Sequence, residues 1–273
     1  MVTPFRENGE LSEDAAARLI THLLVSGSDG LVLAGTTGEG ATLTDDEKVR
    51  LWEIGVSESG GAPIIAGTGS NDTRHSVQLT ERAQQAGVSA ALVVTPYYNK
   101  PNRAGLAAHF RAVAASTDLP LVLYNIPSRS VVDMPNDLLA ELAEISNVVA
   151  VKQARYEHLA PIEGLDLLAG NDDLLARVLD MGGTGGILVA SHLVGPEMRR
   201  MVAEPDERAG IEASLLPLYE ALAVAPLAAS VKAALQMLGH DVGGMRLPLV
   251  AASEQECIGI RAALEAQGLL ERV

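Results

Sequence analysis

The stretch LPLVLYNIPSRSVVDMPNDLLAELAEISNVVAVK, residues 119–152, contains two short apolar runs, Leu119–Tyr124 and Val148–Lys152. Apolar runs without polar alternation are typical of parallel strands that are buried on both faces. The two runs start roughly 30 residues apart, which is the length of a strand, a crossover helix and the next strand. This stretch therefore predicts two neighbouring parallel strands joined by a helical crossover.

The same kind of run recurs along the first two-thirds of the chain. The further candidate strands are Val2–Thr3, Gly30–Ala34, Pro63–Ala66, Ala90–Thr95, Leu165–Ala169 and Gly185–Ala190. Eight such strands alternating with helices predict an α/β fold, a (β/α)8 TIM barrel. An open doubly wound sheet uses the same units and is the structural alternative.

Helix end signals separate these runs. Ser12 precedes an acidic first turn in a segment that stops at Gly27, Thr44-Asp-Asp-Glu47 forms a capping box, and a third helix follows Asn71-Asp72 and ends at Gly87. From about Ile211 onward the pattern is helical only. Helices are expected near 211–223, 227–238 and 254–267, the last opened by a second capping box, Ser253-Glu-Gln-Glu256. We therefore expect a barrel over residues 1–208 and a C-terminal helical extension over 209–273.

Charge and composition exclude several classes of partner. The net charge is −15, with 35 acidic against 20 basic residues, so the chain repels nucleic acid and anionic membranes. The single cysteine, Cys257, forms no internal disulfide, and no Cys/His cluster has metal-ligand spacing. No apolar run is long enough for a signal peptide or a membrane helix. These observations favour a cytoplasmic protein with neither metal, membrane nor nucleic-acid partners.

Reactive side chains stand where the predicted strands end, which is where barrel enzymes hold their chemistry. Lys152 follows the apolar run Val148–Val151, and burial there would favour its neutral, nucleophilic amine. A lysine whose stem is buried and whose ammonium reaches solvent or a carboxylate is the alternative. Tyr124 could relay protons through its hydroxyl, or its ring could simply pack in the core. Arg129 could bind a carboxylate through two parallel hydrogen bonds, or be a solvated surface charge.

Two glycine-rich turns have similar alternatives. Gly35-Thr-Thr-Gly-Glu39 presents amides and hydroxyls that suit a carboxylate, or is a plain strand-to-helix turn, and it lacks the ending of a Walker loop. Gly182-Gly-Thr-Gly-Gly186 is better explained as a tight turn into the last strand than as a phosphate site. The histidines show no spacing typical of a catalytic triad.

Four motifs taken together resemble the dihydrodipicolinate synthase family of class I aldolases. They are Gly35–Glu39, Thr95-Pro-Tyr-Tyr-Asn-Lys-Pro101, Tyr124-Asn-Ile-Pro-Ser-Arg129 and the strand-end Lys152, in the same order and spacing. The resemblance extends from Val2-Thr-Pro-Phe5 to Arg246-Leu-Pro248 and the final helix, so it covers almost the whole chain. It implies a TIM barrel that needs neither a metal nor an organic cofactor.

The resemblance also implies an activity and its residues. Pyruvate would condense with Lys152 as a Schiff base, and the enamine would attack L-aspartate-4-semialdehyde to give the precursor of lysine and diaminopimelate. Thr37 and Ile187 would hold pyruvate, and Arg129 would bind the carboxylate of the semialdehyde. Tyr124 would transfer protons, linked through Thr36 to Tyr98 of a neighbouring subunit, which implies a homotetramer built as a dimer of dimers.

The chain departs from the family at three places. Gln153-Ala-Arg-Tyr156 follows the lysine where an acidic residue and a glycine are usual, and Ser130-Val131 follows Arg129 where a glycine is common. The chain also begins almost at Val2-Thr-Pro-Phe5, so the first strand is expected to be short. The first two departures lie beside the expected mouth and concern the second substrate more than pyruvate.

Lysine-inhibited relatives bind lysine at positions that resemble Ala41, Asp45, Lys48, Asn71, His75 and Tyr97. Those enzymes carry His at the position of Lys48 and Glu at the position of His75. Losing that carboxylate removes the partner of lysine's ammonium, so we expect weak or absent feedback inhibition.

Two other functions are compatible with part of this set of residues. A sister aldolase that cleaves a 2-keto-3-deoxy sugar acid or N-acetylneuraminate would share Lys152 and Tyr124, but is expected to lack the Tyr97-Tyr98 pair together with the Pro127-Ser-Arg129 loop. A non-catalytic barrel that binds carboxylates would not need the proton relay of Tyr124, Thr36 and Tyr98. The synthase is the preferred interpretation.

Overall fold

The computed structural model describes residues 1–271 and divides into two compact units. One unit combines residues 1–62 with the chain from Val189 onward, and the other spans Pro63–Leu188. The expected domain boundary between residues 208 and 209 stays a prediction.

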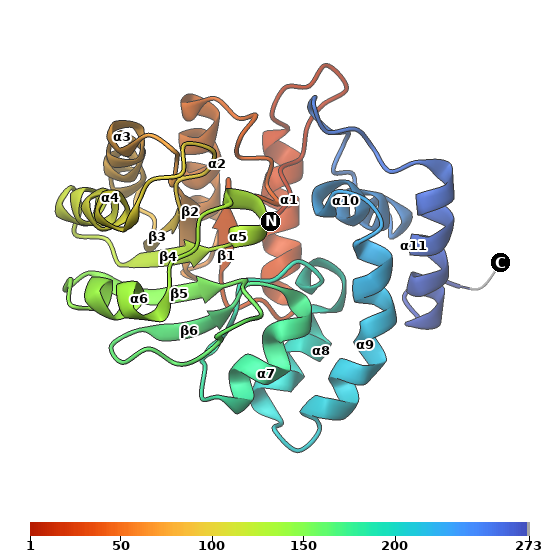
Figure 1. Ribbon diagram of the computed structural model, residues 1–273. Helices are drawn as coiled ribbons and strands as arrows, with labels where there is room; N and C mark the ends of the chain where they lie inside the picture. Colours follow the sequence, from red (N-terminus) through yellow and green to blue (C-terminus); the bar gives the residue numbers. More distant parts are fainter. Residues whose placement is uncertain (272–273) are drawn as a thin grey trace. The chain divides into compact units, whose positions relative to one another are not determined.

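The unit Pro63–Leu188 is built on a parallel sheet in which each strand pairs with the next one along the chain. Its strands are β2 (Ile64–Gly67), β3 (Ala90–Val94), β4 (Leu121–Asn125), β5 (Val148–Gln153), β6 (Asp166–Ala169) and β7 (Gly185–Gly186). The connecting helices are α3 (Thr73–Gln85), α4 (Arg103–Ala115), α5 (Pro127–Ser130), α6 (Asn136–Ala143), the 3₁₀ turn η1 (Asp172–Leu174) and α7 (Leu175–Asp180). Consecutive right-handed crossovers place successive helices on the same face of a sheet, and α3 and α4 lie side by side in Figure 1.

Apolar residues on both sides of this sheet explain its strands. All five residues of β4 are buried, and α6 covers the neighbouring strand β5 with Leu138, Leu139 and Leu142, each 0% exposed. Those leucines recur at the spacing of one helix face. The register pairs Tyr124 of β4 with Lys152 of β5. Both side chains therefore stand at the carboxyl ends of adjacent strands.

The other unit is mainly helical. It contains α1 (Glu13–Val25), β1 (Leu31–Leu33), α2 (Asp45–Glu58), α8 (Ser191–Ala203), α9 (Arg208–Leu222), α10 (Leu227–Met237) and α11 (Glu254–Ala266). The capping boxes predicted at Thr44/Glu47 and Ser253/Glu256 are both confirmed. Helices α9, α10 and α11 pack against one another, with Leu215, Leu235 and Leu264 each 0% exposed.

The strand predicted at Val2–Thr3 is wrong, so residues 1–271 contain seven strands instead of eight. Both residues are fully buried, but their polar groups bond outside any ladder. The amide of Val2 donates to Nε2 of His192 at 3.1 Å, and the hydroxyl of Thr3 donates to the carbonyl of Gly38 at 2.6 Å. The short start of the chain is thus fixed by side chains instead of a neighbouring strand.

The last predicted strand is shorter than expected. Of Gly185–Ala190 only Gly185–Gly186 forms β7, although the amide of Ile187 adds one more bond to the carbonyl of Ala169 at 2.9 Å. The end of that run turns directly into α8. The parallel α/β architecture is confirmed for strands β2 to β7.

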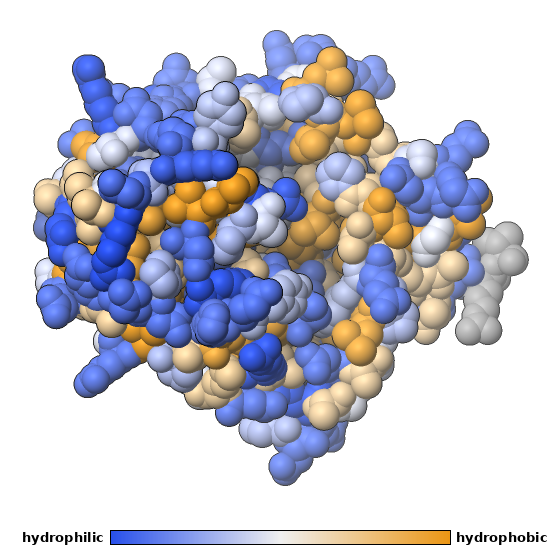
Figure 2. Space-filling model, viewed as in Figure 1, coloured by the Kyte–Doolittle hydropathy of each residue, from blue (hydrophilic) through white to orange (hydrophobic). Residues whose placement is uncertain are grey.

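The visible face in Figure 2 is mostly hydrophilic, with separate hydrophobic patches, as the acidic composition leads one to expect. Among residues 1–271 no single helix has both the length and the hydropathy of a membrane span; only α9 and α10 taken together do, and they are bent by 108°.

Candidate active site

Lys152 and Tyr124 form the centre of the candidate site. Lys152 is 8% exposed and Tyr124 is 4% exposed, and the lysine Nζ lies 4.1 Å from the centroid of the tyrosine ring. The pairing of β4 with β5 fixes both backbones, so the contact is a property of the sheet and not of a mobile loop. A phenol beside a lysine amine provides a proton donor and acceptor where a carbonyl would react.

Burial lowers the pKa of Lys152 to about 8. Removal from water disfavours the ammonium, and this effect exceeds that of Asp172, whose charge raises the pKa; the charge of Arg129 lowers it further. A lysine with an ordinary pKa is almost fully protonated near neutral pH, whereas this amine is neutral in about one molecule in ten at pH 7. The site therefore holds a primary amine that is ready to attack carbonyls.

Arg129 lies on α5, a short helix directly after β4. Proline at its first turn favours its start, and Val131 ends it in the left-handed region at φ 61°. The Arg129 side chain is exposed, yet its charge acts on Lys152. A guanidinium in this position suits the carboxylate of a substrate held at the lysine.

Tyr98 does not pack beside Tyr124 in this chain. It is 87% exposed, with φ at 75°, whereas its neighbour Tyr97 is 37% exposed. The strand end just before them is fixed, because the amide and hydroxyl of Thr95 donate to the carbonyl of Tyr124 at 3.0 and 2.9 Å. The contribution of Tyr98 to a neighbouring subunit stays a prediction.

The Gly35–Gly40 turn carries Thr36 and Thr37 in the other unit. Ala34 and Glu39 adopt left-handed φ values of 57° and 55°. A Cβ at Gly40 would lie 2.2 Å from the carbonyl oxygen of Ala34, so only glycine fits there. Thr36 is exposed and Thr37 is half-buried, which leaves both hydroxyls near the surface of this unit.

A buried ion pair holds this turn in place. The Glu39 side chain is 0% exposed, and its carboxylate accepts bonds from Lys232 Nζ at 2.7 Å and from the amide of Arg246 at 3.0 Å. Lys232 also donates to the carbonyl of Gly244 at 2.6 Å. The ring of Phe5 lies 4.4 Å from Lys232 Nζ and 4.3 Å from the Arg246 guanidinium carbon. Helix α10 and the loop after it thus fix the turn of Thr36 and Thr37.

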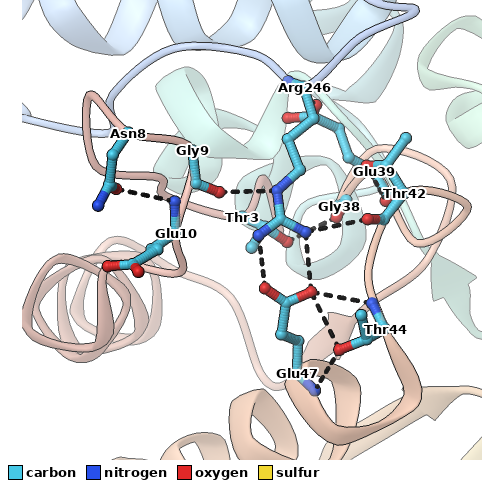
Figure 3. Close-up of polar contacts among 10 residues, drawn as sticks. All are labelled: Thr3, Asn8, Gly9, Glu10, Gly38, Glu39, Thr42, Thr44, Glu47 and Arg246. Atoms are coloured by element: carbon cyan, nitrogen blue, oxygen red, sulfur yellow. Dashed lines mark hydrogen bonds and ion pairs between the residues drawn. The ribbon is translucent and has the colours of Figure 1, made fainter.

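The Arg246 side chain connects this turn to the start of α2, as Figure 3 shows. Its guanidinium donates to the carbonyls of Gly9 and Thr42 at 2.8 and 2.9 Å and to both carboxylate oxygens of Glu47. Those bonds lower the pKa of Glu47 to about 2. Sequence reasoning identified Glu47 as a capping residue but missed its arginine, which is 199 positions away.

The residues that resemble a lysine site are divided between the two units. In one, Nζ of Lys48 lies 3.6 Å from a carboxylate oxygen of Asp45, both on α2, and Ala41 belongs to the turn before that helix. In the other, Asn71 accepts a bond from Asn99, and Nδ1 of His75 lies 3.3 Å from the hydroxyl of Ser70. Their role in lysine binding stays a prediction.

Comparison with known proteins places these features in a family. The model of the dihydrodipicolinate synthetase family matches residues 1–267. The chain belongs to this family. The 4-hydroxy-tetrahydrodipicolinate synthase of Bacillus subtilis is 43% identical over 278 residues, which cover 97% of this chain and 96% of that protein. The 4-hydroxy-tetrahydrodipicolinate synthase 1 of Halalkalibacterium halodurans is 42% identical over 280 residues, covering 98% and 95%.

Solved structures of the family agree. The crystal structure of the Cyanidioschyzon merolae enzyme with lysine bound superposes with a TM-score of 0.95 at 39% identity, covering 99% of this chain and 97% of that one. The family resemblance inferred from the four motifs is therefore confirmed. Identity at this level over nearly the whole chain favours the synthase over the sugar-acid aldolase and the non-catalytic barrel.

Proposed function

We propose that this protein is a 4-hydroxy-tetrahydrodipicolinate synthase, which condenses pyruvate with L-aspartate-4-semialdehyde in the biosynthesis of lysine and diaminopimelate. The observation that carries the proposal is the buried amine of Lys152, 4.1 Å from the Tyr124 ring centroid, in a chain of this family. Two curated synthases at 42 and 43% identity support it.

The chemistry starts at Lys152. Its neutral amine adds to the keto carbon of pyruvate, and Tyr124 supplies and accepts the protons as the carbinolamine loses water to form an iminium. The iminium withdraws electrons from the adjacent methyl group, whose proton leaves to give an enamine. The enamine carbon attacks the aldehyde carbon of the semialdehyde. The semialdehyde's own amine then displaces Lys152 in closing the ring, which regenerates the free lysine.

Other residues bind and orient the substrates. Ile187, directly after β7, is proposed to contact pyruvate, and Arg129 is proposed to bind the carboxylate of the semialdehyde. Thr36 and Thr37 keep the proton-relay and pyruvate-binding roles predicted from the sequence. Tyr98 is proposed to act in a neighbouring subunit, and its 87% exposure supports this. A homotetramer in the cytoplasm follows from the same family resemblance.

A two-substrate assay tests this function. Purified protein with pyruvate and L-aspartate-4-semialdehyde should form product that a dihydrodipicolinate reductase converts with oxidation of its nicotinamide cofactor. Arg129→Ala should raise the KM for the semialdehyde more than that for pyruvate. Cleavage of a 2-keto-3-deoxy sugar acid or of N-acetylneuraminate, without condensation, would favour the sister aldolase instead.

Feedback inhibition is a separate part of the proposal. His75 stands where lysine-inhibited relatives are expected to carry a carboxylate, so lysine should inhibit weakly or not at all. A titration with lysine in the same assay measures this. Half-maximal inhibition at sub-millimolar lysine would contradict it.

A further inference from the structure

The segment that follows Lys152 makes a buried contact that the family comparison does not explain. Arg155 is only 9% exposed, and its guanidinium forms an ion pair with Asp133 in the loop after α5. It also donates to the side-chain oxygen of Asn136 at 3.0 Å and to the carbonyl of His158 at 3.4 Å. Arg155 lies in the segment Gln153–Tyr156, which directly follows Lys152.

Asp133 is bound from two sides. One carboxylate oxygen accepts the bond from Arg155, and the other accepts a bond at 2.8 Å from the side-chain amide of Asn125, the last residue of β4. Asn125 is 0% exposed. Its side-chain oxygen Oδ1 accepts from the backbone amide of Met134 at 3.1 Å, and its side-chain Nδ2 donates to the backbone carbonyl of Met134 at 3.2 Å. The carboxylate thus joins the ends of two adjacent strands.

The chain between these anchors carries Arg129. It leaves β4 at Asn125, forms α5, and returns to Asn125 at Asp133 and Met134, so residues 126–132 form a closed loop. Inside the loop the buried hydroxyl of Ser130 lies 3.0 Å from the carbonyl of Ile126 and 2.8 Å from that of Val132. The loop is therefore braced internally, and its returning end is fixed by Asp133.

The other end of the ion pair is equally constrained. Arg155 follows Lys152 by three residues, and its amide donates to the side-chain oxygen of Gln153 at 3.2 Å. Gln153 is 2% exposed and is the last residue of β5. A buried guanidinium that loses its carboxylate is strongly disfavoured, so the pair restrains the distance between the two loops. The Gln153 side chain is neutral and binds only the backbone amide of Arg155, whereas the Arg155 guanidinium pairs with the carboxylate of Asp133.

We propose that Arg155 and Asp133 are positioning residues that hold the Arg129 loop against the strand of Lys152, and so set the affinity for the second substrate. This inference rests on the proposed function, because it assigns Arg129 to the semialdehyde's carboxylate. Arg129 lies on α5, directly after β4, and β4 pairs with the strand of Lys152. Neither positioning residue touches the reacting atoms.

The experiment compares kinetics with each substrate varied in turn. In Arg155→Gln and in Asp133→Asn, the KM for the semialdehyde should rise by about tenfold, because small displacements of an orienting group have effects of this size or larger. The KM for pyruvate should stay within about twofold, since pyruvate is bound before the loop is needed. Borohydride trapping of pyruvate on Lys152 should be unchanged.

Three further variants sharpen the test. The double variant R155Q/D133N should be no worse than either single variant, because both remove the same contact. Arg155→Lys keeps the charge and one donor and should recover part of the semialdehyde affinity. Arg111→Gln is the matched control, since Arg111 forms an exposed ion pair with Glu141 at 2.6 Å in the same unit and should leave both KM values unchanged.

Equal rises in both KM values, a fall in kcat alone, or additive effects in the double variant would overturn the proposal. If either single variant proves unstable, R155Q/D133N removes the pair without leaving the buried guanidinium unpaired, and its KM values then test the proposal. Wild-type protein that fails to trap pyruvate or to condense the two substrates would instead refute the proposed function. The two failures are therefore distinguishable.

Discussion

Lys152 and Lys232 are both buried, and each ammonium lies close to an aromatic ring, 4.1 Å from the Tyr124 centroid and 4.4 Å from the Phe5 centroid. They differ in what else surrounds them. Lys232 has a carboxylate at 2.7 Å and a carbonyl at 2.6 Å, whereas Lys152 forms neither an ion pair nor a hydrogen bond of its ammonium with any of residues 1–271. The comparison teaches that burial alone does not make a lysine reactive.

The two lysines differ in how strongly a carboxylate opposes the effect of burial on the amine. Burial lowers the pKa of both amines, and at Lys232 the hydrogen bond and charge of the Glu39 carboxylate, 2.7 Å away, oppose this effect. At Lys152 burial exceeds the opposing charge of Asp172, and the pKa falls to about 8. One lysine is thereby a structural cation, and the other is proposed as a nucleophile.

Replacing Lys152 should have the largest effect. Lys152→Met should reduce kcat by a factor of roughly 10³ or more, because no covalent intermediate can form. The free energy of unfolding should not fall, because the lowered pKa shows that burial of the charged amine destabilises the wild-type folded state. This penalty is fully present below pH 8 and is relieved as the pH rises towards 10.5. Steady-state kinetics and urea unfolding at pH 7 measure the two quantities. An active or strongly destabilised variant would break the comparison.

Replacing Lys232 should act on stability instead. Lys232→Met should lower the free energy of unfolding by about 3–5 kcal/mol, because Glu39 is left charged and buried without its partner. The double variant K232M/E39Q should be more stable than K232M, since the uncompensated charge is gone. Urea denaturation at fixed protein concentration measures both. If the single and double variants are equally stable, Lys232 is not a structural cation.

Acid should weaken the ion pair between Arg246 and Glu47. The pKa of Glu47 is depressed to about 2, so its stabilisation is present above about pH 4.5 and is lost as the pH falls from there to 2. Glu47→Gln should therefore lower stability by about 1–2 kcal/mol at pH 7, allowing for partial exposure, and by nothing near pH 2. Glu256→Gln, in the second capping box, should have a smaller effect on stability. Equal effects of E47Q and E256Q would remove Arg246 from this account.

The pH dependence of Schiff-base formation should separate the two lysines further. With the pKa of Lys152 at about 8, the initial trapping rate at limiting pyruvate should rise about fivefold from pH 7 to 8 and level off above 9. A lysine of ordinary pKa would show no plateau below about pH 10. Rapid-quench trapping over this range gives the profile, and a rate that keeps rising to pH 10 would contradict the role of burial.

A third lysine should give the smallest effect. Lys48 lies 3.6 Å from Asp45 one helical turn away, with the aspartate side chain 39% exposed. Lys48→Met keeps the apolar stem and removes a weak pair, so it should change stability by less than about 0.5 kcal/mol and leave pyruvate trapping intact. Thermal unfolding and trapping check both. A large loss of stability would show that a carboxylate partner matters even for a lysine that is not deeply buried.

Local sequence patterns predicted most of the fold and the centre of the site. The apolar run that ends at Lys152, the one that ends at Tyr124 and both capping boxes gave the correct strands and helix starts, because these signals depend on neighbours in the chain. The strand at Val2–Thr3 was wrong since a run of two residues has no period, and its polar groups bond to His192 and Gly38 instead.

The polar networks could not be predicted in the same way. Glu39 meets Lys232 across 193 positions, and Arg155 meets Asp133 across 22. Such contacts leave no periodic trace, because they depend on how the elements pack. From the sequence, Gln153–Tyr156 was expected only to differ from the family. The structure shows that Arg155 in this segment forms an ion pair with Asp133.

The most direct test of the comparison uses the four lysines of the chain together. Protein incubated with pyruvate and borohydride is digested, and the peptides that contain Lys48, Lys100, Lys152 and Lys232 are weighed. The account predicts a reduced pyruvate adduct on Lys152 and none on Lys232. An unmodified Lys152 in active protein, or an adduct on Lys232, would contradict it.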